Sequence, residues 1–236
     1  MACGGPLMTR RVALIHTVGS LAPVFGELTR ELVPDAETTD TVDEGLLQEA
    51  IAAGEVPPAT ATRLAGHVRA ALDDGAELVL VTCSSMGGAV DDLRERTGWP
   101  VVRIDEAMVD AALATGPRIG IVATVGSTLR PTAELVRRRA EQLGRAAGET
   151  TVVTRLVDGA FAKLKAGDTE GHDEAVRAAL RELLPEVDAV LLAQASMARV
   201  AGQLGADETA GTPIFSSPRL GVERLRDLLA ASTPTA

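Results

Sequence analysis

Ile119-Gly120-Ile121-Val122-Ala123-Thr124-Val125-Gly126-Ser127 is a short apolar run that ends in a turn rich in hydroxyl groups and glycine. A continuous apolar run of this length is typical of a strand buried on both faces of a parallel sheet. Similar runs occupy residues 12–15, 78–81, 101–104, 152–153, 189–192 and 213–215. Helical stretches rich in Ala, Leu, Arg and Glu lie among them, at about 58–73, 131–147, 172–184 and 221–231. This alternation predicts an α/β fold built on parallel strands.

The order of these segments occurs twice along the chain. The turn His16-Thr17-Val18-Gly19-Ser20 reappears as Ala123-Thr124-Val125-Gly126-Ser127. Thr82-Cys83-Ser84-Ser85-Met86 reappears as Ala193-Gln194-Ala195-Ser196-Met197. Two further pairs keep the same order at nearly the same offset: 42–43 with 157–158, and 104–106 with 215–217. Such self-similarity indicates an internal repeat.

The repeat predicts two similar parallel-sheet, flavodoxin-like lobes related by a pseudo-twofold axis. We expect residues 10–116 and 218–236 to form the N-terminal lobe, and residues 117–217 the C-terminal lobe. The alternative is one doubly wound sheet whose loops are similar by chance. Open α/β sheets bind ligands at the carboxyl ends of their strands. Two facing lobes would therefore place Cys83 and Gln194 opposite each other across one active-site cleft.

Composition excludes several classes of protein. The chain has 236 residues, a formal net charge of -10 and only 2% aromatic residues, which disfavours nucleic-acid binding. No apolar stretch approaches the ~20 residues of a membrane span, and the first residues, 1–11, hold no run typical of a signal peptide. Cys3 and Cys83 cannot form a disulfide scaffold, so we expect a reduced, cytoplasmic setting.

Cys83 is the strongest candidate for chemistry. It follows an apolar strand and precedes Ser84-Ser85-Met86-Gly87-Gly88, where a helix is expected to begin. Backbone N–H groups at a helix N-terminus favour an anion, which predicts a lowered thiol pKa. Ser84 and Ser85 could hydrogen-bond a thiolate or a carboxylate, and Gly87-Gly88 predicts close approach of the backbone to a ligand. The alternative is a buried, inert cysteine.

Two further loops carry polar groups to the same predicted cleft. Gln194 and Ser196 follow the equivalent strand of the second half, where Gln194 could orient a carboxylate and Ser196 could cap a helix. Thr124, Gly126 and Ser127 form a loop of the kind that binds anions through backbone N–H groups. An amide cannot transfer a proton as a thiol can, so the chemistry is expected to be one-sided.

Histidines and acidic residues offer weaker candidates. His16 ends the first strand and is a candidate acid or base, with a half-buried structural histidine as the alternative. His67 and His172 are expected to be solvated. Asp105 and Glu106 are kept as minor site candidates. No cluster has the spacing of metal ligands and no dinucleotide fingerprint follows the first strand, so neither a metal nor a cofactor is predicted.

The chain resembles the aspartate/glutamate racemase superfamily, which also holds hydantoin racemases, maleate isomerases and arylmalonate decarboxylases. The resemblance covers nearly the whole length. It rests on Val81-Thr82-Cys83-Ser84-Ser85, on Ile119-Gly120-Ile121-Val122-Ala123-Thr124 with Gly126-Ser127, and on Asp188-Ala189-Val190-Leu191-Leu192-Ala193-Gln194-Ala195-Ser196-Met197-Ala198. It implies two lobes with the site between them, no metal, PLP or nicotinamide, and a homo-oligomer.

Racemases of this superfamily use two facing cysteines, one to remove the α-proton and one to return a proton to the opposite face. The resemblance carries the first cysteine over to Cys83, whereas the second falls on Gln194. We therefore expect a cofactor-independent enzyme, of isomerase or decarboxylase type, acting beside the carboxylate of a small acid with one cysteine. The alternatives are a true amino-acid or hydantoin racemase with another second base, and a non-catalytic carboxylate-binding protein.

Overall fold

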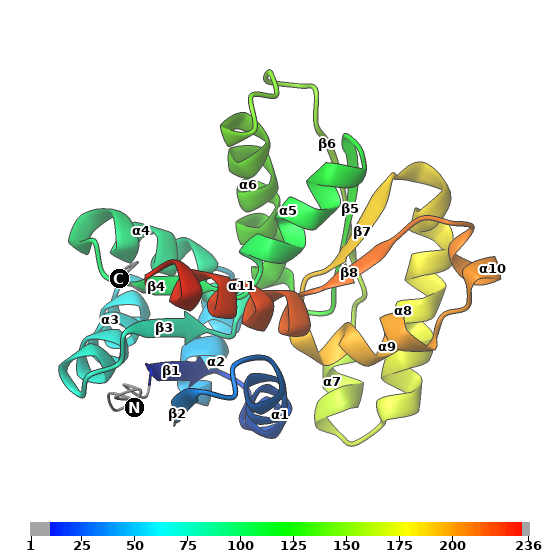
Figure 1. The fold of residues 1–236 in the computed structure, drawn as a ribbon. Helices are drawn as coiled ribbons and strands as arrows, with labels where there is room; N and C mark the ends of the chain where they lie inside the picture. The colour runs from blue at the N-terminus through cyan, green and yellow to red at the C-terminus, as the bar shows by residue number, and fades with distance from the viewer. Residues whose placement is uncertain (1–9, 233–236) are drawn as a thin grey trace, which may run out of the picture.

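The computed structural model describes residues 10–232, so Cys3 lies outside the described residues. Two four-stranded parallel sheets form the framework, with strand orders β2-β1-β3-β4 and β6-β5-β7-β8. The first sheet and its helices lie at the left of Figure 1, and the second sheet lies at the right. The identical strand order confirms the α/β fold with two similar lobes. When each sheet is numbered from its own first strand, the order is 2-1-3-4, as in the first four strands of the flavodoxin-like order.

The first half of the chain forms the first sheet and the segments between its strands. Its elements are β1 (Arg10–His16), η1 (Gly19–Leu21), α1 (Ala22–Leu32), β2 (Ala36–Val42), α2 (Glu44–Ala53), α3 (Pro58–Asp73), β3 (Leu78–Val81), η2 (Ser84–Met86), α4 (Gly87–Thr97), β4 (Val101–Arg103) and α5 (Glu106–Thr115).

The second half repeats this plan. Its elements are β5 (Arg118–Ala123), α6 (Gly126–Gln142), β6 (Thr151–Leu156), α7 (Ala160–Lys165), α8 (Thr169–Leu183), η3 (Leu184–Glu186), β7 (Ala189–Leu192), η4 (Ala195–Met197), α9 (Ala198–Gln203), α10 (Ala206–Thr209), β8 (Ile214–Ser216) and α11 (Ser217–Ala231).

Strand β2 was not among the strands expected from apolar runs. Its sequence, Ala-Glu-Thr-Thr-Asp-Thr-Val, is polar, and the strand occupies an edge of the first sheet. It nevertheless pairs with β1 over its whole length, from Arg10 with Ala36 to His16 with Val42. The side chains of an edge strand need little burial, so such a strand need not be apolar. Its three β-branched threonines were the sequence feature that could have indicated a strand.

Backbone pairing also corrects part of the repeat alignment. The N–H of Thr82 donates to Ile15 and the N–H of Ala193 donates to Val122, so Cys83 and Gln194 are structural equivalents. The predicted equivalence of 42–43 with 157–158 is wrong by one residue, because the N–H of Asp43 donates to His16 whereas that of Val157 donates to Ala123. The predicted equivalence of 104–106 with 215–217 is wrong by two residues. Val101 pairs with Val79 on the first sheet and Ile214 pairs with Val190 on the second.

Each sheet is covered by helices on both faces, and two of these helices are exchanged between the halves. Buried residues of α5 pack with Ile121 and Leu191 of the second sheet, although α5 directly follows β4. Buried residues of α11 pack with Leu14 and Leu80 of the first sheet, and Figure 1 shows α11 running back toward β4. The predicted lobe limit at 116–117 stays a prediction, and the packing of α5 favours an earlier limit, before 106.

A buried group of ion pairs joins the two lobes behind the Cys83 loop. The Arg103 side chain is 1% exposed and donates to both carboxylate oxygens of Asp105, at 2.7 and 2.8 Å, and to Asp91. Arg138 from α6 of the second lobe also reaches Asp91. Glu106 accepts hydrogen bonds from Arg94. Asp105 and Glu106 are therefore held in structural ion pairs, away from the residues that line the site.

Within residues 10–232, no helix combines the length and the apolar character that crossing a membrane requires.

Candidate functional site

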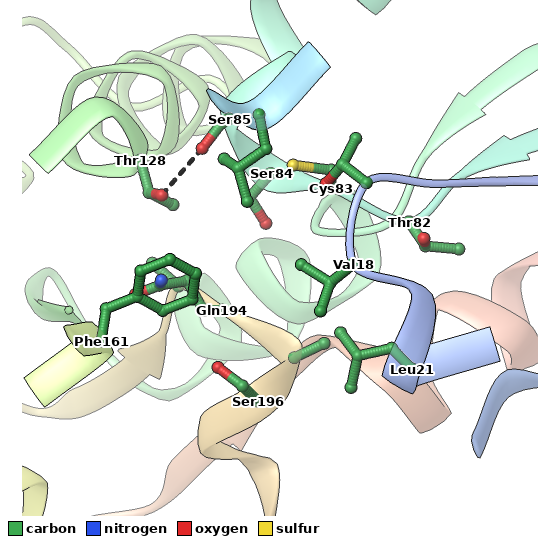
Figure 2. A pocket seen from close by; sticks show the side chains of 14 residues that line it. Val18, Leu21, Thr82, Cys83, Ser84, Ser85, Thr128, Phe161, Gln194 and Ser196 are labelled. Atoms are coloured by element: carbon green, nitrogen blue, oxygen red, sulfur yellow. Dashed lines mark hydrogen bonds between the residues drawn. The ribbon is translucent and has the colours of Figure 1, made fainter. Parts of the chain in front are cut away.

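One pocket lies where the carboxyl ends of both sheets meet. It encloses about 430 Å³ of atom-free space, its open side included. Cys83 and Gln194 both line it, as the repeat predicts. The lining residues are Thr17, Val18, Leu21, Leu47, Thr82, Cys83, Ser84, Ser85, Thr128, Phe161, Ala193, Gln194, Ala195 and Ser196. Figure 2 shows Cys83, Ser84 and Ser85 along one side, with Gln194 and Ser196 on the other.

Cys83 occupies the N-cap position of η2, which leads directly into α4. Its backbone is extended, at φ -125° and ψ 114°, and the turn that follows directs the N–H groups of Ser85 and Met86 toward the sulfur. Burial raises the pKa of the thiol, although hydrogen bonds from Thr17, from these N–H groups and from the Ser85 hydroxyl act in the opposite direction. The predicted lowering of the Cys83 pKa is therefore wrong, because desolvation outweighs the helix N-terminus.

Gln194 occupies the equivalent position at the N-terminus of η4. Its side-chain oxygen accepts hydrogen bonds from the backbone N–H of Thr124, at 2.5 Å, and from the Thr124 hydroxyl, at 3.1 Å. These two donors fix the orientation of the amide, so its N–H₂ group is available to donate hydrogen bonds to a ligand. Thr124 itself does not line the pocket, and its contribution is to orient Gln194.

The predicted hydroxyl residues divide into two groups. Ser84 and Ser196 line the pocket, and Ser85 lines it while also bonding across the lobes to Thr128, at 3.0 Å (Figure 2). Ser127 lies 3.4 Å from the Ser85 hydroxyl but is not part of the lining. Gly126 is exposed and also lies outside the lining.

His16 is fully buried beneath the pocket and does not line it. Its Nδ1 lies 2.9 Å from the Thr82 hydroxyl, and its Nε2 lies 2.9 Å from Asp40. Both ring nitrogens are thus engaged, so the geometry favours support of the Thr82 turn over direct acid–base chemistry. The expectation that His172 is solvated is wrong, because this side chain is fully buried against Asp173 and Arg199.

The family of the chain follows from comparison with known proteins. The family model for Asp/Glu/hydantoin racemases matches residues 10–225, which is most of the chain. The chain belongs to the Asp/Glu/hydantoin racemase family. It is accordingly an enzyme of the racemase and isomerase type. A search of curated proteins gave no match.

Solved structures agree with the fold of this racemase-family chain. Glutamate racemase RacE1 from Bacillus anthracis has 16% sequence identity and a TM-score of 0.68, covering 94% of this chain and 82% of that one. Allantoin racemase from Klebsiella pneumoniae has 22% identity and a TM-score of 0.67, covering 96% and 90%. A liganded double mutant of arylmalonate decarboxylase has 18% identity and a TM-score of 0.61, covering 97% and 94%.

Several pocket residues of this racemase-family enzyme were not assigned a role from sequence. Phe161 on α7 and Leu47 on α2 supply apolar walls. Neither residue lies in a motif. Each is an ordinary apolar residue of a helix, α2 or α7, that was not among the predicted helices. Gly87 was predicted to approach a ligand, which is wrong, because its missing side chain makes room for the Arg103 guanidinium.

Within the described chain, no group of three or more His, Cys, Asp or Glu side chains is arranged to hold a metal ion.

Proposed function

We propose that this enzyme acts at the carbon beside the carboxylate of a small acid, with Cys83 as its single acid–base group. The observation that carries the proposal is the pairing of Cys83 with Gln194 at equivalent positions of one pocket. A thiol can give or take a proton, whereas an amide cannot. Proton transfer is therefore confined to the Cys83 side, which suits decarboxylation or one-sided isomerisation.

Hydrogen-bond donors suited to a carboxylate surround the thiol. The pocket lies at the N-termini of the helical segments that begin after Cys83 and Gln194, where backbone N–H groups and helix dipoles favour negative charge. Ser84 and Ser196 add hydroxyl groups from the two sides. Loss of CO₂ or of a proton from the bound acid leaves an enediolate-like anion, and fixed donors of this kind stabilise it.

The state of the thiol favours proton donation. Because burial raises the pKa of Cys83, the neutral thiol is the main form near neutral pH. In decarboxylation, the bond to the departing CO₂ breaks and its electron pair stays on the remaining acid as the enediolate. Cys83 then gives its S–H proton to the carbon, and the thiolate recovers a proton from water.

The neutral lining favours an acid without an amino group. The described residues that line the pocket include no Asp, Glu, Lys or Arg side chain. A carboxylate can be bound there by N–H and O–H donors, but the ammonium group of an α-amino acid would find no carboxylate partner. Desolvating that cation without a partner is costly.

The experiment follows turnover of substituted malonates and α-substituted acids in D₂O by NMR and chiral chromatography. We expect CO₂ release or isomerisation with deuterium delivered to one face. Cys83→Ser should lose about 10²-fold or more of the rate, the usual contribution of an acid–base group. Gln194→Cys should gain deuterium exchange on the opposite face.

Two outcomes would overturn the proposal. One is full activity in the Cys83→Ser variant. The other is racemisation of one enantiomer by the wild type at an enzymatic rate, because this requires a second base facing Cys83.

A further inference from the structure

A second cavity lies beside the pocket, between α2 and α7. We call it the α2–α7 annex. It encloses about 740 Å³ of atom-free space, its mouth included, and shares four lining residues with the first pocket: Thr17, Val18, Leu47 and Phe161. The annex therefore lies directly beside the pocket that holds Cys83.

The walls of the annex are mostly apolar. Leu47 and Ile51 contribute from α2, and Phe161 and Leu164 contribute from α7. Ile51 is 41% exposed, which makes it one of the few large apolar side chains that the described residues leave open to water. A ligand bound in the annex would cover part of this side chain.

A lysine lines the annex but not the pocket beside Cys83. The 236-residue sequence contains two lysines, Lys163 and Lys165, and both lie on α7. Lys165 lines the annex, whereas Lys163 does not. Within the described chain no carboxylate pairs with Lys165. Glu44 also lines the annex, and one of its carboxylate oxygens accepts a hydrogen bond from the N–H of Gly19 at 2.9 Å.

We propose that the annex binds the apolar substituent of the acid held beside Cys83, and that Lys165 binds a second anionic group at the end of that substituent. This inference rests on the proposed function, because the reacting carboxylate must occupy the pocket. The favoured ligand is thus an elongated acid with an apolar chain between two anionic ends. Burial of the chain supplies affinity, and Lys165 selects its length.

The test measures Kd by titration calorimetry for monocarboxylates from butyrate to octanoate and for dicarboxylates from succinate to suberate. Each methylene that enters the annex should lower Kd by about fourfold. Dicarboxylates long enough to reach Lys165 should bind up to about fivefold more tightly than monocarboxylates of equal length, the range of an exposed ion pair. Bound acids should also slow alkylation of Cys83 by iodoacetamide.

Matched variants separate the parts of the proposal. Lys165→Met should remove the gain from the second carboxylate, whereas Lys163→Met, on the same helix, should keep it. Ile51→Ser should weaken octanoate several-fold more than butyrate.

Short acids that neither bind nor protect Cys83 would refute the proposed function itself. Short acids that bind while longer ones gain nothing would refute only the annex. Equal losses in the two lysine variants would refute the role of Lys165.

Discussion

Gly87 and Gly88 are adjacent residues of α4 whose replacement by alanine should have opposite effects. Gly87 has φ -55° and ψ -43°, so its backbone conformation is open to alanine. However, a Cβ atom there would lie 2.8 Å from Nε of Arg103 and closer still to the rest of the guanidinium. A Cβ on Gly88 would meet no atom within 4 Å.

The magnitude follows from what Arg103 must give up. Arg103 is 1% exposed, and its partner Asp105 is fully buried. Displacing the guanidinium breaks the paired hydrogen bonds, and disrupting a buried ion pair costs about 3–5 kcal/mol. Alanine returns about 1 kcal/mol of helix propensity. We expect Gly87→Ala to lower the free energy of unfolding by about 2–4 kcal/mol, and Gly88→Ala to raise it by up to about 1 kcal/mol.

Urea unfolding followed by circular dichroism measures both variants against the wild type. In thermal unfolding, Gly87→Ala should lower Tm by roughly 5–15 °C for a chain of this size. Because Gly87 directly follows η2, the same variant should also change the rate at which iodoacetamide labels Cys83. A Gly87→Ala variant as stable as Gly88→Ala would show that Arg103 moves without loss, which refutes the reasoning.

Three further predictions concern the pocket and its surroundings. Because burial raises the pKa of the Cys83 thiol, alkylation of the peptide that contains it should increase at higher pH than alkylation of free cysteine; coincident profiles would contradict this. Because no acidic side chain lines the pocket, succinate should stabilise the protein against heat more than aspartate does, and the reverse order would argue for an amino-acid site. Burial opposes ionisation of Asp173, but hydrogen bonds from Arg199 and His172 hold the pKa of this carboxyl below its usual value. The ionised Asp173 carboxylate therefore stabilises the fold fully above the ordinary aspartate pKa of about 3.9. This stabilisation is lost as the pH falls through the lower pKa that Asp173 has in the folded protein. Near pH 7, Asp173→Asn should thus unfold at a lower urea concentration than the wild type. This difference between the two urea midpoints should become smaller below about pH 4. A difference that does not change with pH would contradict the proposed stabilisation by ionised Asp173.

The repeat and the position of Cys83 could be predicted from local sequence. A buried parallel strand needs apolar side chains on both faces, so β1, β3, β5 and β7 are visible as continuous runs. Polar residues directly after such runs lie at the carboxyl edge of a sheet. That rule places Cys83 and Gln194 in one site without coordinates. It does not reveal edge strand β2, whose polar residues need little burial.

Other properties depend on residues that are distant in the chain. The raised pKa of the Cys83 thiol reflects its desolvation in the folded chain, which no local motif records. Gly87 is explained by Arg103, and His16 is held by Asp40 and the Thr82 hydroxyl. Phe161 lies on α7 of the second half and lines the pocket together with residues of the first half, such as Cys83.

Sequence by itself determined the fold class, the plan of two similar lobes and the place of Cys83 at the carboxyl edge of a sheet, because each depends on the order of short segments. Only the tertiary structure decided the direction of the thiol pKa shift, the exchange of α5 and α11 between the halves, and the annex that Lys165 lines. These properties arise from desolvation and from contacts between distant segments, and both exist only once the two lobes have packed together.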